Sequence, residues 1–213
     1  RARELLAHWQ NLDASELPRT EILRHVLEYS LLAAHRHVFG VFFWFVVLST
    51  VGLGPAAAVL YRMAEFASRY WSYRSQVTGV STHDRLSQTL FSVVDHVPAR
   101  LTAFGFAVVG NFEDAVDAWR RHAVLWVRPN EGTILSAASG ALGVRLGGQV
   151  APTSDEGKDV SRTLTQGDAP DVIEAQGSTT GAAPQMAHLR SVVGLIWRSV
   201  VLWMLLLALL SLA

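Results

Sequence analysis

Residues 38–61, "VFGVFFWFVVLSTVGLGPAAAVLY", decide the fold. They run for 24 positions without a charged side chain, between Arg36 and Arg62. A helix needs about 20 predominantly apolar residues to cross a bilayer, and Gly and Pro are tolerated inside membrane helices. We therefore predict a membrane-spanning helix here. The alternative is a helical hairpin that is broken at "GLGP" (52–55) and buried in a soluble core.

A second apolar segment lies at the C-terminal end. Residues 199–213, "SVVLWMLLLALLSLA", carry no charge, and the preceding "VVGLIW" extends the stretch to 21 apolar residues interrupted once, by Arg198. A long arginine side chain can reach from such a position toward an interface. Two independent segments of this kind predict an all-α, polytopic helical membrane protein whose partner is the lipid bilayer.

The composition agrees with this class and excludes several others. Half of the residues are hydrophobic and only 17% are charged, whereas soluble domains carry about 25% charged residues. The net charge is zero, so long-range attraction gives no support for a nucleic-acid partner, and we predict none. The chain has no cysteine, which excludes disulfides, thiolate zinc sites and a cysteine nucleophile.

The rest of the chain predicts three regions. Apolar residues at helical spacing predict amphipathic surface helices over 2–12 and 111–126, and a helix that opens at Arg19 or Thr20. From 149 to about 187, Gly, Ser, Thr, Asp, Pro and Gln dominate, and such a stretch cannot offset its ordering entropy by burial. We predict a helical membrane domain over 1–148 that lacks its N-terminal helices, a disordered polar loop over 149–187, and a transmembrane helix over 188–213.

The segment around Pro98 leaves two alternatives. Leu90–Gly110 can cross the membrane if Asp95, His96 and Arg100 are satisfied inside the protein, because ionisable groups at membrane depth face a cavity or one another. Otherwise Pro98 ends the helix at the surface, with Asp95 and Arg100 in water.

Residues 129–148, "PNEGTILSAASGALGVRLGG", are rich in glycine but match neither common phosphate motif. No lysine follows a glycine as in a P-loop, and the spacing does not fit the dinucleotide fingerprint. Arg145 is the one strong donor, and its planar fork suits a phosphate or carboxylate. The alternative is close packing of a helix through its small residues, with Arg145 in water.

The histidine pair His35 and His37 does not predict a metal site. Arg36 stands between the two histidines, and no cluster of carboxylates accompanies them. An interfacial position is the simpler interpretation, and we predict no metal ligand in this chain.

Four elements resemble one known family. The stretch 129–148 resembles the "SPNAG…AAMAGALGVRLGG" signature of the adenosylcobinamide-phosphate synthase family, the CobD/CbiB proteins of cobalamin biosynthesis. "DHVPARLTA" (95–103) resembles its "N-aromatic-IPARLTA" element, "GPAAAVLYRMAEF" (54–66) its "GPxxALxYRxxNT" element, and "GVFFW" (40–44) its "APLFW" segment. The elements occur in the family's order and cover about residues 26–150.

The resemblance implies an activity and a location. Such a protein would be a multi-pass protein of a bacterial-type inner membrane that joins an aminopropanol-type amine to a carboxylate of cobyric acid. ATP and a corrinoid would be its substrates. Asn130, Gly132 and Arg145 would help to form the site, with Arg100 and Glu28 as supporting polar groups.

Departures from the family pattern support a second hypothesis. Where the family reads "ESxAENTxDG", the second acid, the Asn and the Asp become Leu32, Ala33 and Arg36; elsewhere, Glu65 and Ser68 replace an Asn and an Asp, and Phe91 and Ser92 stand where two acids are expected. Leucine and alanine cannot coordinate or hydrogen-bond as carboxylates and amides do. The chain therefore resembles a divergent branch, similar to the AmpE-type regulatory membrane proteins. The alternative function is a non-catalytic inner-membrane sensor or regulator, and whether the protein is an enzyme stays open at this point.

Overall fold

The computed structural model describes residues 19–78, 82–147 and 178–212, and every regular element in these ranges is helical. The elements are α2 (Arg19–Ala34), the π-helical turn η1 (His35–Phe39), α3 (Gly40–Ser49), α4 (Gly54–Thr78), α5 (Thr82–Val109), α6 (Phe112–His122), the 3₁₀ turn η2 (Ala123–Leu125), α7 (Pro129–Leu142) and α9 (Met186–Leu212). Two isolated β-bridges accompany them. The all-α prediction is confirmed, and the helix predicted over 2–12 lies outside the described residues.

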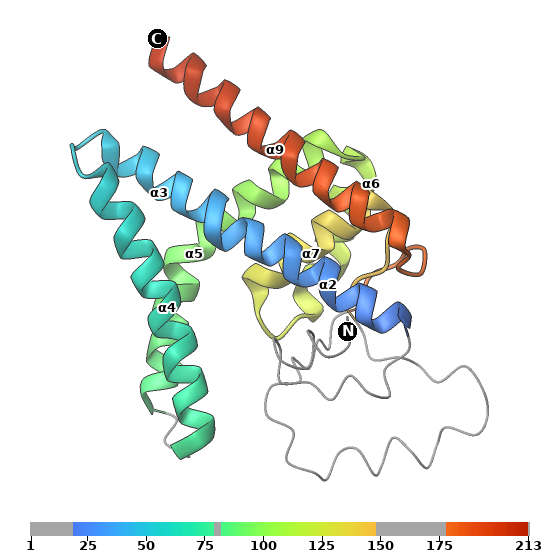
Figure 1. Ribbon diagram of the computed structural model, residues 1–213, viewed down its shortest axis with the longest axis horizontal. Helices are drawn as coiled ribbons and strands as arrows, with labels where there is room; N and C mark the ends of the chain where they lie inside the picture. Colours follow the sequence, from blue (N-terminus) through green and yellow to red (C-terminus); the bar gives the residue numbers. More distant parts are fainter. Residues whose placement is uncertain (1–18, 79–81, 148–177, 213) are drawn as a thin grey trace.

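Two helices are long and apolar enough to cross a membrane. One is Thr20–Ser49, 30 residues that join α2, η1 and α3 into one rod, and the other is Met186–Leu209 in α9, with 24 residues (Figure 1). Only 28% and 17% of their most apolar windows are buried inside the protein, whereas the core helix of a soluble protein is mostly buried. These exposed apolar surfaces agree with the predicted all-α membrane protein.

The prediction of one continuous helix over 38–61 is wrong. α3 ends at Ser49, and α4 starts at Gly54 and folds back beside α3 (Figure 1). The turn between them needs Gly52 at a φ of 77°, a left-handed conformation that glycine adopts without steric cost. Pro55 then occupies the first turn of α4, where a missing N–H costs nothing. The break at "GLGP" is therefore real, and the first span begins further toward the N-terminus than predicted.

α5 continues through Pro98 instead of ending there. A proline inside a helix leaves the carbonyl four residues before it without its usual N–H donor, and here that carbonyl belongs to Val94. The indole Nε1 of Trp44 in α3 donates to the Val94 carbonyl oxygen at 3.3 Å. The neighbouring helix thus satisfies the free acceptor. Pro98 therefore does not end the helix, and Asp95 is buried, whereas His96 is exposed and Arg100 is half-buried. α5 is not one of the two helices that are apolar enough to span, so a membrane crossing by Leu90–Gly110 stays a prediction.

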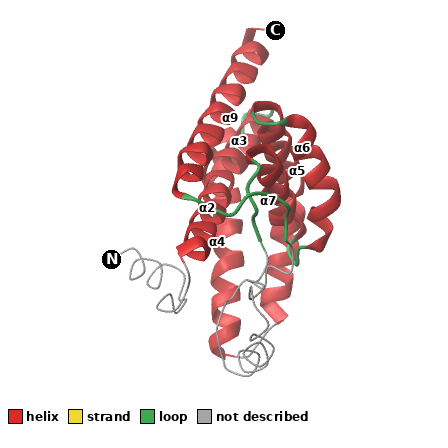
Figure 2. Ribbon diagram, turned by 90° about the vertical axis from the view of Figure 1, so that its right-hand side faces the viewer, coloured by secondary structure: helices red, strands yellow, loops and turns green. Residues whose placement is uncertain are grey.

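α7 lies at the centre of the packing, between α2 on one side and α5 and α6 on the other (Figures 1 and 2). Ten of its residues are buried, among them Asn130 and every residue from Gly132 to Gly140. A Cβ atom on Gly140 would overlap the backbone carbonyl group of Asp114 in α6. Close packing through small residues is therefore the structural role of this part of the glycine-rich stretch.

Part of the predicted disordered loop over 149–187 is ordered, and the prediction is wrong for residues 178–187. Thr179 is buried, and its hydroxyl lies 2.6 Å from the Ser139 hydroxyl and 2.9 Å from the Leu146 carbonyl oxygen. β-Bridges join Gly147 to Ser178 and Val144 to Ala182. The buried polar groups of this segment are satisfied because the backbone after α7, at Leu146, supplies hydrogen-bond partners for Thr179. Residues 149–177 of the predicted loop lie outside the described residues.

Helix α6 forms where the amphipathic pattern predicted it, with Phe112 exposed and Val116 and Trp119 partly buried. The buried face consists of the small residues Ala115 and Ala118, whereas Phe112 is 52% exposed and Val124, just after the helix, is 84% exposed. Asn111 caps the helix by accepting the Asp114 N–H. The outward apolar side agrees with the predicted position at the membrane surface, which stays a prediction.

Gly140→Ala tests the packing of α7. We expect it to lower the free energy of unfolding by about 1–3 kcal/mol, because the added methyl group meets rigid backbone of α6 rather than a movable side chain. Gly194→Ala in α9 is the matched control, since a Cβ there meets no atom within 4 Å. Thermal unfolding in detergent measures both variants; equal midpoints would contradict the packing described.

Candidate functional site

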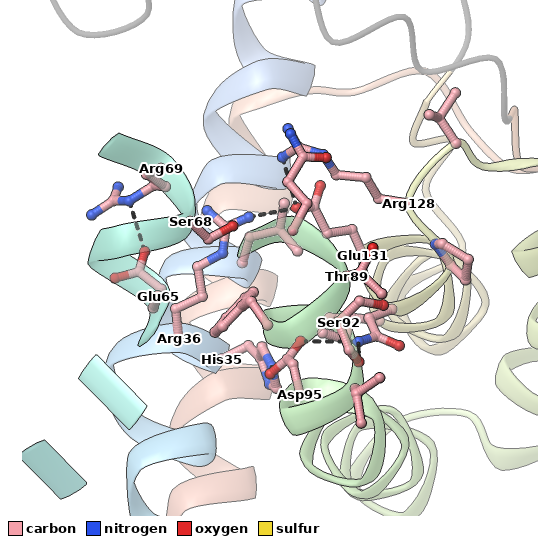
Figure 3. A pocket seen from close by; sticks show the side chains of 18 residues that line it. His35, Arg36, Glu65, Ser68, Arg69, Thr89, Ser92, Asp95, Arg128 and Glu131 are labelled. Carbon is pink, nitrogen blue, oxygen red and sulfur yellow. Dashed lines mark hydrogen bonds and ion pairs between the residues drawn. The ribbon is translucent and has the colours of Figure 1, made fainter. Parts of the chain in front are cut away.

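A polar cavity of about 310 Å³ opens where η1, α4, α5 and the start of α7 meet (Figure 3). It lies beside the most buried part of the protein, and four chain segments that are far apart in the sequence contribute to it. Its polar lining residues include His35, Arg36, Glu65, Ser68, Arg69, Thr89, Ser92, Asp95, Arg128, Asn130 and Glu131.

The π-helical turn η1 supplies two of these side chains. His35 and Arg36 are consecutive residues in it, and both line the cavity. π-Helical turns are rare and occur frequently at functional sites. His35 is 1% exposed, so its imidazole is part of the protein interior and not of an interfacial surface.

The Asp95 carboxylate is the most connected group of the site. Its Oδ1 accepts hydrogen bonds from His35 Nε2 at 2.9 Å and from the Tyr61 hydroxyl at 2.8 Å. Its Oδ2 lies 3.4 Å from the Asn130 amide nitrogen, which also donates to the Ser92 carbonyl oxygen at 2.9 Å. The other ring nitrogen of His35 lies 2.9 Å from the Thr102 hydroxyl. The carboxylate is thus held by η1, α4 and α7 together.

Tyr61 donates its hydroxyl proton to Asp95. It lies in α4, and its side chain is buried. A tyrosine phenol ordinarily keeps its proton at neutral pH. A phenol that keeps its proton can donate to Asp95 but cannot act as a base.

Arg36, Arg128 and Glu131 form a second part of the lining (Figure 3). Glu131 Oε1 lies 2.6 Å from Arg36 Nη2 and 3.2 Å from Arg128 Nη1. The Arg36 and Glu131 side chains are 19% and 15% exposed. Because solvent screens the pair only in part, its attraction exceeds that of an ordinary surface ion pair.

Glu65 carries a third carboxylate to the cavity and is also paired with two arginines. Its two oxygens lie 2.9 Å from Arg62 Nη1 and 2.8 Å from Arg69 Nε, and its side chain is 1% exposed. A buried carboxylate is tolerated only with such partners. Both glutamates of the cavity are therefore neutralised within the protein.

Of the five predicted site residues, only Asn130 lines this cavity. Gly132 comes two residues after Asn130 in α7. It is buried against Trp126, whose side chain leaves no room for a Cβ atom on the glycine. Gly132 therefore supports the start of α7 by close packing and presents no group to a ligand.

The other three predicted residues lie elsewhere. Glu28 accepts the Gly147 N–H at 2.7 Å, and the Arg145 side chain is exposed near by; this region follows the far end of α7, about 20 Å from its start for a helix of this length. Arg100 donates to the His96 carbonyl oxygen of its own helix. The structure does not bring the five together. A role for Glu28, Arg100 or Arg145 would require a site separate from this cavity, and that stays a prediction.

The pattern of the sequence does not predict His35, Tyr61 and Asp95 as one network. A signal was present, since Asp95 interrupts an apolar run of α5 and an ionisable residue in such a run faces the interior. His35 was interpreted as interfacial because Arg36 and His37 follow it. Nothing in the spacing relates positions 35, 61 and 95, because they belong to three different helices.

The fold and the site define a class first: a helical membrane protein with a partly open cavity, lined by polar side chains, between its helices. Within that class, the family model for CobD/Cbib protein matches residues 1–177, and the chain belongs to this family. It is 30% identical over 207 residues to the cobalamin biosynthesis protein CobD of Stutzerimonas stutzeri, covering 97% of this chain and 60% of that relative. It is 34% identical over 148 residues to the protein of the same name from Chromobacterium violaceum, covering 69% of this chain and 45% of the relative. No solved structure matches.

The departures from the family pattern meet at the cavity. Leu32, Arg36, Glu65, Ser68, Phe91 and Ser92 all line it, although they come from three separate motifs. These six positions, which come from separate parts of the sequence, therefore lie together at one place in the fold, whereas Ala33 is not part of the lining.

A double-mutant cycle on Arg36→Gln and Glu131→Gln tests the charge pairing. We expect a coupling energy of about 1–3 kcal/mol, the range of charge-assisted hydrogen bonds, because both side chains are largely shielded from solvent. The exposed pair Arg121 and Asp117 on α6, with side chains 71% and 51% exposed, is the control, with about 0–1 kcal/mol expected. Unfolding in mixed micelles measures both cycles. Equal coupling in the two pairs would show that Arg36 and Glu131 are not shielded.

Proposed function

We propose that the protein containing this chain performs the amide-forming step of cobalamin biosynthesis, as an adenosylcobinamide-phosphate synthase. It would join an aminopropanol-type amine to a carboxylate of cobyric acid, with ATP as the source of activation. The chain spans 60% and 45% of the two curated relatives, so the activity is proposed for the whole protein.

One observation carries this proposal: the family motifs, separated by up to a hundred residues, converge on one polar cavity. Asn130 of the glycine-rich signature faces Asp95 of the second motif, and Glu65 of the third lies in the same lining. The cavity is at the small end of the range of ligand pockets, about 300–1,000 Å³. It suits the amine better than the corrinoid, which is much larger and would approach from outside.

A second candidate function is a non-catalytic sensor or regulator in the membrane. The observation that favours it is the internal pairing of the cavity charges. Arg36 and Arg128 share Glu131, and Arg62 and Arg69 share Glu65. Charges that already bind one another are less available to a substrate. The similarity to AmpE-type proteins that accompanies this alternative stays a prediction.

The direction of the two candidate spans supports a proposal for the membrane topology. The rod from α2 to α3 and helix α9 run in the same direction (Figures 1 and 2). A chain that crosses twice in one direction must return between the two crossings. We infer that α4 makes this return, since it is 25 residues long, about 37 Å at 1.5 Å per residue, and lies antiparallel to α3. Its outward side carries exposed apolar residues: Val59, Leu60, Met63, Phe66 and Tyr70.

Complementation tests the proposed activity. The full-length gene is expressed in a bacterium that lacks its own adenosylcobinamide-phosphate synthase, cobyric acid is supplied, and cobalamin-dependent growth is scored. We expect growth with the wild type, loss of growth with Asn130→Ala, and retained growth with Arg145→Ala, because Arg145 is outside the cavity. Absence of growth with wild-type protein detected in the membrane would favour the regulatory function. Loss with Arg145→Ala alone would place the site at the other end of α7.

Single cysteines test the topology, since the chain has none of its own. We expect Val51→Cys, in the turn between α3 and α4, to react with a membrane-impermeant maleimide from one side of the membrane. Tyr73→Cys, near the end of α4, and Ala183→Cys, before α9, should react from the other side. All three residues are exposed in the protein. If Val51→Cys and Tyr73→Cys react from the same side, α4 does not cross.

A further inference from the structure

An apolar groove of about 560 Å³ runs along α4, which lies at the edge of the molecule (Figure 1). It shares no lining residue with the polar cavity. Its lining consists of Val41 of α3 and a stripe of residues along α4. The large side chains of this stripe are Val59, Arg62, Met63, Phe66, Tyr70 and Trp71. We call this surface the outer groove.

The apolar side chains of the outer groove are far from buried. Val59 is 58% exposed, Met63 62% and Phe66 64%, so no described part of the chain covers them. In a membrane protein, such side chains meet lipid tails or another apolar chain. The groove is therefore a surface that an apolar partner can occupy.

The length of the groove suits one leaflet of a bilayer. Its stripe extends from position 58 to position 71 of α4, which is about 20 Å at 1.5 Å per residue. The hydrocarbon core of a bilayer is about 30 Å thick, so each leaflet contributes about half of that. If α4 crosses the membrane, the groove lies along the acyl chains of one leaflet and its Trp71 end reaches the headgroup level.

The Trp71 end of the groove has the chemistry of a membrane interface. The Phe66 and Tyr70 rings stack with their centroids 6.2 Å apart, and the Tyr70 and Trp71 rings meet edge to face at 5.6 Å. The Arg74 guanidinium carbon lies 5.5 Å from the Trp71 ring centroid. Trp and Tyr are enriched at headgroup level, and an arginine fork matches a phosphate group. Aromatic rings and a cation thus stand together where a headgroup would lie.

The charge of α4 is complementary to an anionic headgroup. Glu65 is the one acidic residue of the helix, whereas Arg62, Arg69 and Arg74 are basic. Arg62 and Arg69 share the Glu65 carboxylate, so this cluster keeps an excess of positive charge. Arg62, which lines the groove about midway, is neutralised by this contact and is tolerated beside lipid tails. Arg74 is exposed at the end of the helix.

We propose that the outer groove binds an anionic phospholipid, with an acyl chain along Val59, Met63 and Phe66 and the phosphate group at Arg74. The inference uses the membrane crossing proposed for α4 and is independent of the synthase activity. A second copy of the chain, or a further helix of the protein, would supply apolar surface but has no need of an arginine and aromatic rings at one end. A phospholipid matches both parts of the groove.

Lipid affinity of the purified full-length protein tests the headgroup contact. The protein in detergent is titrated with phosphatidylglycerol or with phosphatidylcholine of the same chains, and native mass spectrometry gives the Kd of each. We expect wild-type protein to bind phosphatidylglycerol about fivefold more tightly, the contribution of one arginine near an anionic headgroup. Arg74→Gln should remove this preference and leave the affinity for phosphatidylcholine unchanged. Arg121→Gln, whose side chain on α6 is 71% exposed, is the matched control and should keep the preference.

A second pair of variants tests the acyl-chain contact. Ala67 lines the groove and is half-buried, so Ala67→Trp should fill it and weaken the binding of both lipids about fivefold or more. Val193→Trp is the control, because Val193 is an exposed apolar residue of α9, 66% exposed, and should change neither affinity. Glycerol phosphate, a headgroup fragment without acyl chains, should not compete with phosphatidylglycerol. Competition by this fragment at equal concentration would show a site for free anions and overturn the lipid assignment.

The remaining outcomes are equally definite. Equal affinity for the two lipids, or a preference that survives Arg74→Gln, overturns the inference. If no lipid binds and Ala67→Cys is unreactive toward a membrane-permeant maleimide in detergent, another protein segment or a second copy covers the groove, and the inference is wrong. The reactions of Val51→Cys and Tyr73→Cys report the crossing of α4 separately. None of these measurements depends on amide formation, so failure of the proposed function would leave them unchanged.

Discussion

A carboxylate buried between helices needs hydrogen-bond donors from the protein, and this constraint on Asp95 links the elements around it. The donors come from three different elements: His35 from the π-helical turn, Tyr61 from α4 and Asn130 from α7. Each of these hydrogen bonds fixes one helix against α5. An unpaired carboxylate at this depth would cost far more than any one of the bonds returns, so the four elements are stable only as a set. The cavity is the space that remains where this set meets.

The charges of the cavity form a closed arrangement with one exception. Four arginines and two glutamates pair with one another, as Arg36 and Arg128 do with Glu131. Such an arrangement stabilises the cavity walls and provides little net charge for a ligand. The exception is Asp95, whose partners are the His35 imidazole and the Tyr61 hydroxyl rather than an arginine.

The glycine-rich signature performs two tasks at its two ends. Its first residues bring Asn130 into the cavity, whereas its middle, around Gly140, lets α7 approach the backbone of α6. Its end is held by two contacts. β-Bridges join it to residues 178–182, and the Gly147 N–H donates to Glu28 of α2. Most of the glycine-rich stretch 129–148 therefore serves packing, and only its first residues border the candidate site.

The sequence by itself determined the class of the fold and the family. Two long apolar segments require helices, because backbone groups in a membrane must be satisfied within their own segment, and four motifs in order sufficed for the family. The tertiary structure decided the rest. The turn at Gly52 divides the helix predicted over 38–61 into α3 and α4. Trp44 donates to the carbonyl group that Pro98 leaves without a partner, so α5 continues past the proline. The local sequence around Pro98 cannot show this, because Trp44 is more than fifty residues away from it. The same holds for the candidate site. Asn130 could be predicted from its motif, whereas the contacts of Asp95 with His35 and Tyr61 could not, because these residues lie on other helices. The periodicity of the sequence predicts which residues lie on one face of a helix, whereas only the packing of the helices determines which of them line the same cavity.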